Sequence, residues 1–567
     1  MKGLKFHLDF VILVLVIAAF VSVAAQRLAT VPVPEGDEAF TLQVPYEMLY
    51  RGKLALPMLR YLGGNIENAW HSFIPVYFVI LAEFHKLFGF GLAQGRAFNL
   101  VTAALTLLMI YLIGRRLFDW RAGLIAVVML VGDQTFLERS RLLRDDYAAA
   151  AFALLAFYLY EIAEERKKAR WYVASGLAAG AGVMCHTNML YMLGAICLLI
   201  LMREGPRALF PFGARTSGID PISRDSNKHE RAHSIPGTSK KLYILVASAL
   251  AVMAYEIVYD IIDYRNFLLQ NRGDDVHFRI LEYKGWLNNL LEERLRYQKW
   301  SQGSLLFPGL PHFTLRVFQV LTIAAIVYLL VICVRRIRRN LLVDPRARVL
   351  IVTGVVVLFH ALIVSHKRIY YMAHMAPWFA LCVGILARDV LSKIARLRAA
   401  QWPRARLAYG AAVAAVALLS AVYGYQLARQ TNIYLEKVLN PNLATFDEFA
   451  AVLRGIVGDD LCPVAVQNPS IWLAFPEKDR CFATLEKRMS DYIDIDGKDY
   501  ALVRRAKRGF KALEGTEEKY HLLGQMGNTP YGNIVVYYTG TDARYLSLEP
   551  KRYQFFGELR GYTMEAH

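Results

Sequence analysis

The chain has 567 residues, of which 56% are hydrophobic and 20% are charged. This composition is typical of polytopic membrane proteins and argues against a soluble multidomain enzyme. The formal net charge of +18 would suggest nucleic-acid binding in a soluble protein, but most of the excess lies in short clusters between apolar runs. Such clusters mark cytoplasmic loops, so we expect no nucleic-acid partner. They are Arg115/Arg116/Arg121, Arg166/Lys167/Lys168/Arg170, Arg335/Arg336/Arg338/Arg339 and Arg396/Arg398/Arg404/Arg406.

The first apolar run extends from Phe10 to Ala25 and follows Lys2 and Lys5. Its end, Ala24-Ala25-Gln26, loosely resembles a signal-peptide cleavage site. A retained anchor is favoured because the chain returns to the membrane repeatedly. The lysines on the leading flank place the N-terminus in the cytoplasm and the residues after the span outside.

Apolar runs predict eleven transmembrane spans, and with this number every basic cluster lies on the cytoplasmic side. A further apolar stretch, residues 73–91, contains Glu83, His85 and Lys86, and counting it as a span would turn the clusters outward. We expect it to be an external helix lying in the membrane interface. The predicted spans are roughly residues 10–27, 95–114, 121–138, 146–163, 171–187, 189–203, 241–260, 314–334, 349–365, 370–388 and 405–426.

This topology gathers acids, cations and tyrosines on the external face. The first external loop contains an acidic pair, Asp37-Glu38, and the second contains the run Arg139 to Asp146. Lysine and arginine on an external loop oppose the usual charge bias, so Lys367-Arg368 in the fifth loop suggests an anionic partner near the outer surface. The other polar residues on this face include His71, His186, Asn188, Tyr370 and Tyr371.

The composition becomes polar after Ala428. Thr445 and Glu448 have the spacing of a capping box and predict a helix that extends to about Val457. Short β-rich runs follow at 463–466, 500–503 and 533–538. We therefore expect a polytopic α-helical membrane domain, residues 1–426, with an external loop and interfacial helices over 28–94. An external, soluble α/β domain follows over 427–567.

Six cysteines are present. Four lie in apolar spans, where they are most simply small core residues. Cys462 and Cys481 fall in the external domain, where an oxidising compartment would allow them to pair, and a disulfide between them is favoured.

The order of several motifs resembles the C-type glycosyltransferase superfamily, within the branch of the protein O-mannosyltransferases and lipid A aminoarabinose transferases. The resemblance covers residues 5–200 and returns at 367–377. Two departures concern Phe40, where the aminoarabinose transferases commonly have arginine, and His71-Ser72, where the family often has His-Pro-Pro-Leu. The motifs are Asp37-Glu38-Ala39, Tyr46 to Lys53 with Pro57, His71, Lys86 to Gly89, Gly95 to Asn99, Tyr111 to Phe118 and Arg141 to Asp145.

The resemblance implies transfer of a sugar from a polyprenyl-phosphate donor to an acceptor hydroxyl on the external face, with inversion at the anomeric carbon. Asp37 matches the family's general base, with Glu38 as a substitute base or a structural hydrogen-bond acceptor. Guanidinium and ammonium groups would stabilise the leaving phosphate. We expect Lys367 and Arg368 first and Arg144 and Arg141 next as phosphate ligands, and His71, Asp145, Asp146, His186, Tyr370 and Tyr371 as substrate-binding residues.

No spacing resembles a dedicated metal motif, so metal ligands remain unassigned. A divalent ion such as Mg, Mn or Zn could use oxygen and imidazole atoms of Asp37, Glu38, Asp145, Asp146 and His71. The expected partners are the lipid-linked donor, membrane lipids, and an acceptor that is a lipid, a glycan or a protein. The expected location is the bacterial inner (plasma) membrane.

Two other classes share many of these features. A lipid-linked sugar transporter or flippase would also be polytopic, but it usually has ionisable residues at mid-membrane depth and repeated halves. A ligase or polymerase using a polyprenyl-diphosphate oligosaccharide would share the external basic loops, but it would not require the Asp37-Glu38 pair after the first span. A noncatalytic lipid-binding scaffold is a third alternative.

Overall fold

The structure, a computed structural model, describes most of the helical region and parts of the C-terminal region. Cys462 and Cys481 lie outside the described residues, so their pairing stays a prediction. The described ranges are 2–62, 64–71, 75–204, 240–270, 283–302, 313–336, 341–364, 367–399, 403–440, 445–458, 464–466, 469–474, 482–484, 501–505, 520–529 and 532–554.

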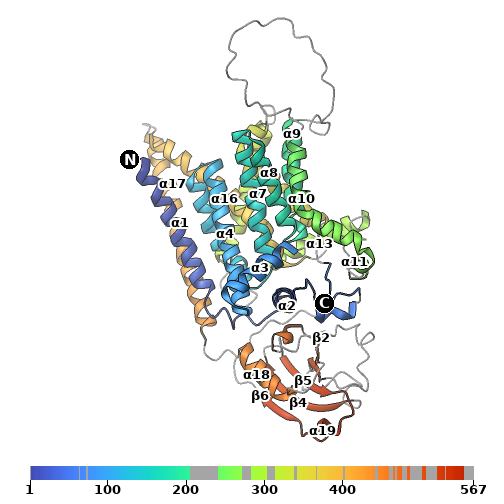
Figure 1. Cartoon of the computed structure of the whole chain (residues 1–567). Coiled ribbons are helices and arrows are strands. Elements are labelled where there is room, and N and C mark those ends of the chain that lie inside the picture. The colour runs from blue at the N-terminus through green and yellow to red at the C-terminus, as the bar shows by residue number, and fades with distance from the viewer. Residues whose placement is uncertain are drawn as a thin grey trace, which may run out of the picture.

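A bundle of long helices forms the main body, and each of the eleven predicted spans falls on one of them. Figure 1 shows the bundle with the N-terminus at the end opposite the C-terminal sheet. Within the described residues, eight helical segments are long and apolar enough to cross a membrane, and Leu8–Ala24 and Trp120–Val131 are shorter apolar helices. The polytopic helical class is therefore confirmed. The helices are α1 (Lys2–Ala24), α4 (Leu92–Leu117), α5 (Trp120–Val131), α7 (Asp146–Arg166), α8 (Ala169–Val183), α9 (Leu190–Glu204), α10 (Lys240–Ile262), α14 (Phe313–Arg336), α15 (Pro345–Leu362), α16 (Met372–Ala399) and α17 (Pro403–Val438).

One predicted span is divided in two. The run expected over 121–138 ends as α5 at Val131, and a short helix, α6 (Gln134–Arg139), follows it. The break has a local cause, because the Asp133 side chain accepts a hydrogen bond from the backbone N–H of Thr135 and so caps α6.

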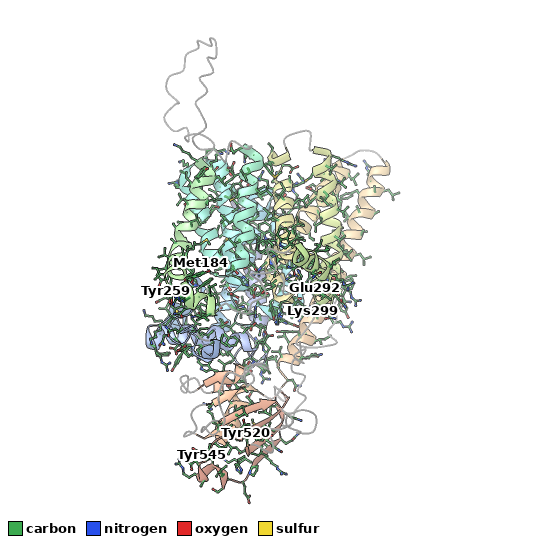
Figure 2. The ribbon with its side chains drawn as sticks, turned by 90° about the vertical axis from the view of Figure 1, so that its right-hand side faces the viewer. Met184, Tyr259, Glu292, Lys299, Tyr520 and Tyr545 are labelled. Atoms are coloured by element: carbon green, nitrogen blue, oxygen red, sulfur yellow. The ribbon has the colours of Figure 1, made fainter. Side chains whose placement is uncertain are left out.

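Shorter helices lie at the end of the bundle that faces the sheet (Figure 1). Figure 2 labels Glu292 and Lys299 on one of them, α13, which lies against the side of the bundle. Helix α3 occupies the stretch predicted to lie in the membrane interface; it has 14 residues, packs against α2 and α4 and is not among the candidate spans. Its place in the interface stays a prediction. These elements are α2 (Gly36–Arg51), η1 (Pro57–Leu62), α3 (Pro75–Phe88), η2 (Thr187–Met189), α11 (Tyr264–Gln270), α13 (Tyr283–Ser301) and η5 (Ile369–Tyr371), while η4 (Leu341–Val343) precedes α15.

The C-terminal region contains a six-stranded sheet in the order β2-β1-β3-β5-β4-β6. Strand β1 pairs in parallel with β2 and β3, β5 is antiparallel to β3 and β4, and β6 is parallel to β4. The predicted helix is α18, whose capping box joins Thr445 and Glu448, and the three predicted strands are β1, β3 and β5. The elements are α18 (Phe446–Val457), β1 (Val464–Val466), η6 (Pro469–Ala474), β2 (Phe482–Thr484), β3 (Ala501–Arg505), β4 (His521–Thr529), β5 (Gly532–Tyr538), α19 (Ala543–Leu546) and β6 (Lys551–Gln554).

The sheet region meets the bundle through α2. Trp472 of η6 is fully buried, and its ring centroid lies 6.0 Å from that of Tyr46 on α2. The predicted boundary at residue 426 falls inside α17, which continues to Val438. The division into two domains stays a prediction.

Helices α8 and α10 pack closely through small residues. A Cβ atom at Gly180 would lie 2.6 Å from the carbonyl oxygen of Ala249 and 3.0 Å from its Cα. These are backbone atoms, so a side chain at Gly180 cannot be accommodated by a rotamer change. Gly194 on α9 is exposed and has no atom within 4 Å of the same position, so it offers a matched control.

We expect Gly180→Ala to destabilise the protein by about 1–3 kcal/mol through overpacking and Gly194→Ala to leave stability nearly unchanged. Thermal unfolding of the purified protein in detergent measures both. Equal midpoints for the two variants would contradict the close packing of α8 on α10.

Candidate functional site

Glu38 is a buried anchor at the start of α2. Its side chain is fully buried, and the Arg96 guanidinium on α4 donates to both carboxylate oxygens at 2.8 and 2.7 Å. The backbone N–H groups of Leu143 and Glu35 also donate to it, at 2.8 and 3.0 Å. The carboxylate therefore joins α2 to α4 and to the segment before α7. This geometry favours a structural role for Glu38 over that of a substitute base.

Asp37, one residue earlier, has the opposite environment. Its side chain is 53% exposed and forms an ion pair with Arg144. The same guanidinium donates from Nε to Asp146 Oδ2 at 2.8 Å, and its Cζ lies 3.8 Å from the ring centroid of Tyr370. Arg144 thus holds two carboxylates in place and leaves one face of Asp37 accessible. Asp145, next to Asp146 in the sequence, is half-buried, and its partial removal from water raises the pKa of its carboxyl to about 6.

The second oxygen of Asp146 faces two histidines. His374 Nε2 lies 3.2 Å and His186 Nε2 3.8 Å from Asp146 Oδ1. The other ring nitrogen of His374, Nδ1, lies 3.2 Å from His360 Nε2. His360 Nδ1 in turn lies 2.9 Å from the carbonyl oxygen of Val356. Three contacts thus connect Asp146 to His374, His374 to His360, and His360 to the carbonyl oxygen of Val356.

If both imidazoles are neutral, these three contacts have one N–H group too few for each to be a hydrogen bond. A carbonyl and a carboxylate oxygen only accept hydrogen bonds, so three links need three N–H groups, and two neutral imidazoles supply two. Asp146 Oδ1 and His374 Nε2 are among the buried side-chain atoms that have no hydrogen-bond partner. A further proton or a metal ion between these two atoms would satisfy both of them.

The ligand atoms of Asp146, His186 and His374 lie within 4.8 Å of one another, which is close enough for a divalent ion. However, His186 Nδ1 accepts a hydrogen bond from the backbone N–H of Asn188 at 3.1 Å, so the neutral ring carries its proton on Nε2, the atom that would bind the metal. Two of the three donors fit a metal ion as they stand, and the third does not. Of the five ligands suggested by the sequence, only Asp146 belongs to this group.

Tyr370 and Tyr371 lie beside these groups. The guanidinium carbons of Arg139 and Arg368 lie 5.1 and 5.9 Å from the Tyr370 ring centroid. Tyr371 packs its ring against His186 and His374, with centroids 5.6 and 5.7 Å away. The structure thus brings together Asp37, Arg144, Asp146, His186, Tyr370 and Tyr371.

The predicted cation pair divides into two environments. The Lys367 ammonium is buried, donates to the carbonyl oxygens of His360, Ala361 and Val364 at 2.8–3.2 Å, and forms an ion pair with Glu293 at 3.0 Å. Burial lowers the pKa of Lys367, and Glu293 opposes that shift. Lys367 therefore caps the C-terminus of α15. Arg368 is exposed and donates to the Tyr370 hydroxyl at 2.9 Å.

Arg141 is also held by internal groups. Its guanidinium donates to the Tyr434 hydroxyl at 2.7 Å and to the carbonyl oxygens of Gln26 and Val31 at 2.6 and 2.7 Å. These bonds tie α17 to the segment after α1. Phosphate binding by Arg141 and Lys367 stays a prediction that their hydrogen bonds do not favour.

His71 lies in a separate cluster. Its Nδ1 is 3.0 Å from Asp260 and its Nε2 is 3.0 Å from Asp263, while its ring stacks on Tyr259 at 4.6 Å. Both ring nitrogens face carboxylates, so His71 holds the first loop against the end of α10. No described contact joins it to the group around Asp37.

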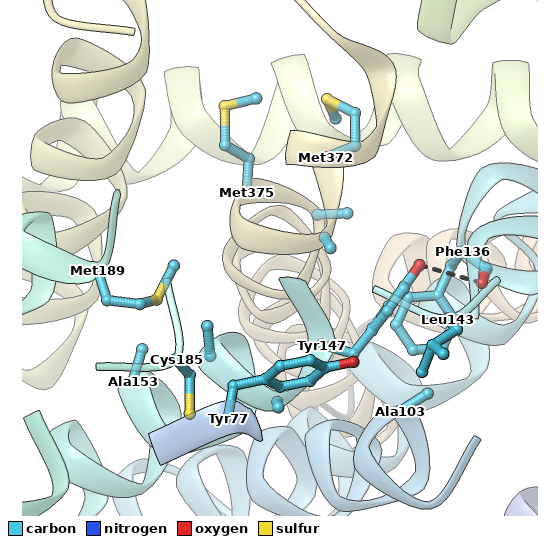
Figure 3. Packing of buried hydrophobic residues seen from close by; sticks show 14 of the residues in the cluster. Tyr77, Ala103, Phe136, Leu143, Tyr147, Ala153, Cys185, Met189, Met372 and Met375 are labelled. Atoms are coloured by element: carbon cyan, nitrogen blue, oxygen red, sulfur yellow. Dashed lines mark hydrogen bonds between the residues drawn. The ribbon is translucent and has the colours of Figure 1, made fainter. Parts of the chain in front are cut away.

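An apolar layer supports the site. Tyr77 of α3 is fully buried and Tyr147 of α7 nearly so, and Tyr147 donates to the carbonyl oxygen of Phe136 at 3.2 Å. Figure 3 shows this layer together with Cys185, Met372 and Met375. It fixes the first turns of α7 and α16, which position Asp146 and His374.

The sequence reasoning missed His360 and His374. A signal was present, because both fall in predicted apolar spans, and ionisable residues within spans are usually functional. Their pairing depends on the packing of α15 against α16, which a linear sequence does not display.

Residues 71–211 match a family model described as dolichyl-phosphate-mannose-protein mannosyltransferase; this is less than half of the chain. No curated protein matches the chain significantly. ArnT from Cupriavidus metallidurans, solved bound to undecaprenyl phosphate, is similar with 13% identity and a TM-score of 0.56, over 94% of this chain and 99% of that one. The apo form of ArnT gives 12% identity and a TM-score of 0.55, over 97% and 100% of the two chains.

The oligosaccharyltransferase of Archaeoglobus fulgidus is a second similar structure. Its complex with Zn and sulfate gives 14% identity and a TM-score of 0.52, over 93% of this chain and 73% of that one. At such identities the likeness establishes the fold. The resemblance to the C-type glycosyltransferase fold that the motifs predicted is therefore confirmed.

We expect Glu38→Gln to destabilise the protein by about 3–5 kcal/mol, because it leaves the buried Arg96 guanidinium without its counter-charge. Asp37→Asn removes a half-exposed carboxylate and should change stability by less than about 1 kcal/mol. Thermal unfolding in detergent compares the two. A loss of stability in Asp37→Asn as large as in Glu38→Gln would show that the two acids do not have separate roles.

Proposed function

We propose that this protein is an integral-membrane glycosyltransferase that moves a sugar from a polyprenyl-phosphate donor to an acceptor hydroxyl. The observation that carries the proposal is the accessible Asp37 carboxylate, held by a largely buried arginine, Arg144, on a C-type glycosyltransferase fold. The ArnT structure of that fold was solved with undecaprenyl phosphate bound, which supports a polyprenyl-phosphate donor here.

Asp37 is the proposed general base. Attack on the anomeric carbon requires removal of the acceptor hydroxyl proton, and a positioned carboxylate within hydrogen-bond reach can take it. Arg144 orients the Asp37 carboxylate and ties it to Asp146, whose helix is fixed in the bundle. Glu38 is a positioning residue, because its bonds to Arg96 and Leu143 hold the first turn of α2.

Arg368 is the proposed first ligand of the donor phosphate. Its guanidinium is exposed and lies beside Tyr370, whereas the Lys367 ammonium is occupied by backbone carbonyls and Glu293. A guanidinium can offer two parallel hydrogen bonds to phosphate oxygens as negative charge accumulates there. Arg144 is a second ligand only if it releases part of its hold on Asp37.

The proposed reaction is a single displacement. The acceptor oxygen forms a bond to the anomeric carbon while the bond between that carbon and the donor phosphate oxygen breaks. The bonding electrons leave on the phosphate and the proton passes to Asp37, so the anomeric configuration inverts. Asp145, Asp146, His186, Tyr370 and Tyr371 are proposed to contact the sugar or the acceptor.

We place the reaction at the external face of a bacterial inner membrane, with the N-terminus cytoplasmic and the C-terminal region outside. The support is the distribution of the basic clusters, whose described residues include those at the C-terminal ends of α4, α7 and α16, remote from Asp37. The transferred sugar is proposed to be a hexose or a pentose, and the acceptor a lipid, a glycan or a protein.

A second candidate is transfer of an oligosaccharide from a polyprenyl-diphosphate donor. The similarity to the Archaeoglobus fulgidus oligosaccharyltransferase fold favours it. The donor distinguishes the two functions, because only the first releases polyprenyl monophosphate.

We expect the wild-type protein in lipid nanodiscs to release polyprenyl phosphate from polyprenyl-phosphate sugars when a membrane extract supplies the acceptor. Asp37→Asn should lower this rate at least 100-fold, on the scale of lost general-base catalysis. Glu67→Gln, which changes an exposed acid in the same loop, is the control and should retain activity. Equal rates for wild type and Asp37→Asn would move the base elsewhere, and release from diphosphate donors alone would select the second candidate.

Arg368→Gln should raise the KM for the donor about 10-fold or more, the scale of a lost hydrogen bond to a charged group. Lys367→Gln should act mainly on stability, because its ammonium caps α15. Steady-state kinetics with varied donor, together with thermal unfolding, separates these effects. A larger KM change for Lys367→Gln than for Arg368→Gln would reverse the assignment.

A further inference from the structure

A basic pocket lies at the end of the bundle opposite the C-terminal sheet. It has a volume of about 260 Å³ and lies between the C-terminal part of α14, the start of α15 and the C-terminal part of α16. Figure 1 shows this end of α16 remote from the sheet. Its charged lining consists of Arg335, Arg346, Arg388, Asp389, Lys393 and Arg396.

Two of the five cations are neutralised. Asp389 is the single carboxylate in the lining; it accepts from Arg346 at 2.8 and 2.9 Å and from Arg388 at 2.8 Å. These arginines also reach Asp344 and Asp119 outside the lining. The two guanidinium groups therefore face three carboxylates, which neutralise them.

The other three cations have no carboxylate partner among the described residues. Lys393 lies 5.6 Å from the ring centroid of Tyr328, and Arg396 donates to the backbone of Ser392. All three side chains are exposed. The sequence stretches that directly follow Arg335 and Arg396, residues 336–343 and 397–413, contain no Asp or Glu.

A second pocket at the same end shows that unpaired cations are not a general property of this face. It has the same volume of about 260 Å³, but its three cations face three acids. Arg348 pairs with Glu161 at 2.8 Å, Arg116 with Glu165 at 2.6 Å and Arg203 with Glu164 at 2.5 Å. The bias toward basic residues at cytoplasmic loops accounts for a basic surface, but not for three unpaired cations that line one cavity.

We propose that the pocket between α14, α15 and α16 binds a phosphate group, either the headgroup of an anionic phospholipid or a soluble phosphate. Guanidinium and ammonium groups that converge from separate helices suit phosphate oxygens, and basic pockets between spanning helices suit anionic headgroups. Apolar residues beside the pocket, Val331 and Val334 on α14, are 42% and 64% exposed, so an acyl chain could lie along the same helix.

This site is separate from the group around Asp37. His374 and Arg396 lie on the same helix, α16, and are 22 residues apart, which corresponds to roughly 33 Å at 1.5 Å per residue. The proposal does not depend on the glycosyltransferase function, so either can fail without the other.

The lipid arm of the test uses the full-length protein extracted from membranes that contain phosphatidylglycerol in neutral phosphatidylcholine. Native mass spectrometry counts the phosphatidylglycerol that stays bound. A variant with Arg335→Gln, Lys393→Gln and Arg396→Gln should retain at least 10-fold less than wild type. A control with Arg170→Gln, Arg398→Gln and Arg406→Gln removes the same charge from exposed positions outside the pocket and should retain the wild-type amount.

The soluble arm titrates lipid-depleted protein with inorganic phosphate by calorimetry. Binding that the pocket variant loses and the control keeps would support the site with a soluble phosphate as its ligand. Equal loss in both variants, or no retained lipid and no phosphate binding by wild type, would overturn the proposal. Thermal unfolding of the three proteins verifies that all are folded.

Discussion

The buried ion pair between Glu38 and Arg96 is the interaction on which the rest of the site depends. Two charges out of contact with water are tolerated only when their hydrogen bonds are satisfied, and here the carboxylate accepts four. Those bonds fix the first turn of α2, and with it Asp37, against α4 and the segment before α7. The Asp37 carboxylate is therefore held in a defined position although it lies on the exposed side of α2.

From that anchor the polar groups form a connected chain. Arg144 joins Asp37 to Asp146, and Asp146 faces a histidine pair that ends at a backbone carbonyl. The chain extends from a half-exposed carboxylate to the buried interior of the bundle, where Asp146 Oδ1 and His374 Nε2 face each other at 3.2 Å. The charge state of Asp146 is therefore linked to that of His374, and through Arg144 to the placement of Asp37.

The sequence predicted the helices well because the signal for a membrane span is local. Each of the eleven apolar runs is a helix, and the one divided run breaks at a residue, Asp133, whose capping role a closer reading of the sequence could have found. The roles of individual polar residues were less accessible. Lys367 looked like a phosphate ligand, but its ammonium caps α15, and His374 joins the site only because α15 and α16 pack together. The roles of Lys367 and His374 are set by contacts that helix packing brings together, and a linear sequence does not display these contacts.

The most direct test of the account is a cryo-EM structure of the protein in nanodiscs with a non-hydrolysable polyprenyl-phosphonate sugar. The account predicts that the phosphonate lies within hydrogen-bond distance of the Arg368 guanidinium, with the anomeric carbon open on the side of Asp37 so that an acceptor hydroxyl fits between them. A phosphonate bound away from Arg368, or an anomeric carbon that Asp37 cannot approach through one hydroxyl, would contradict it.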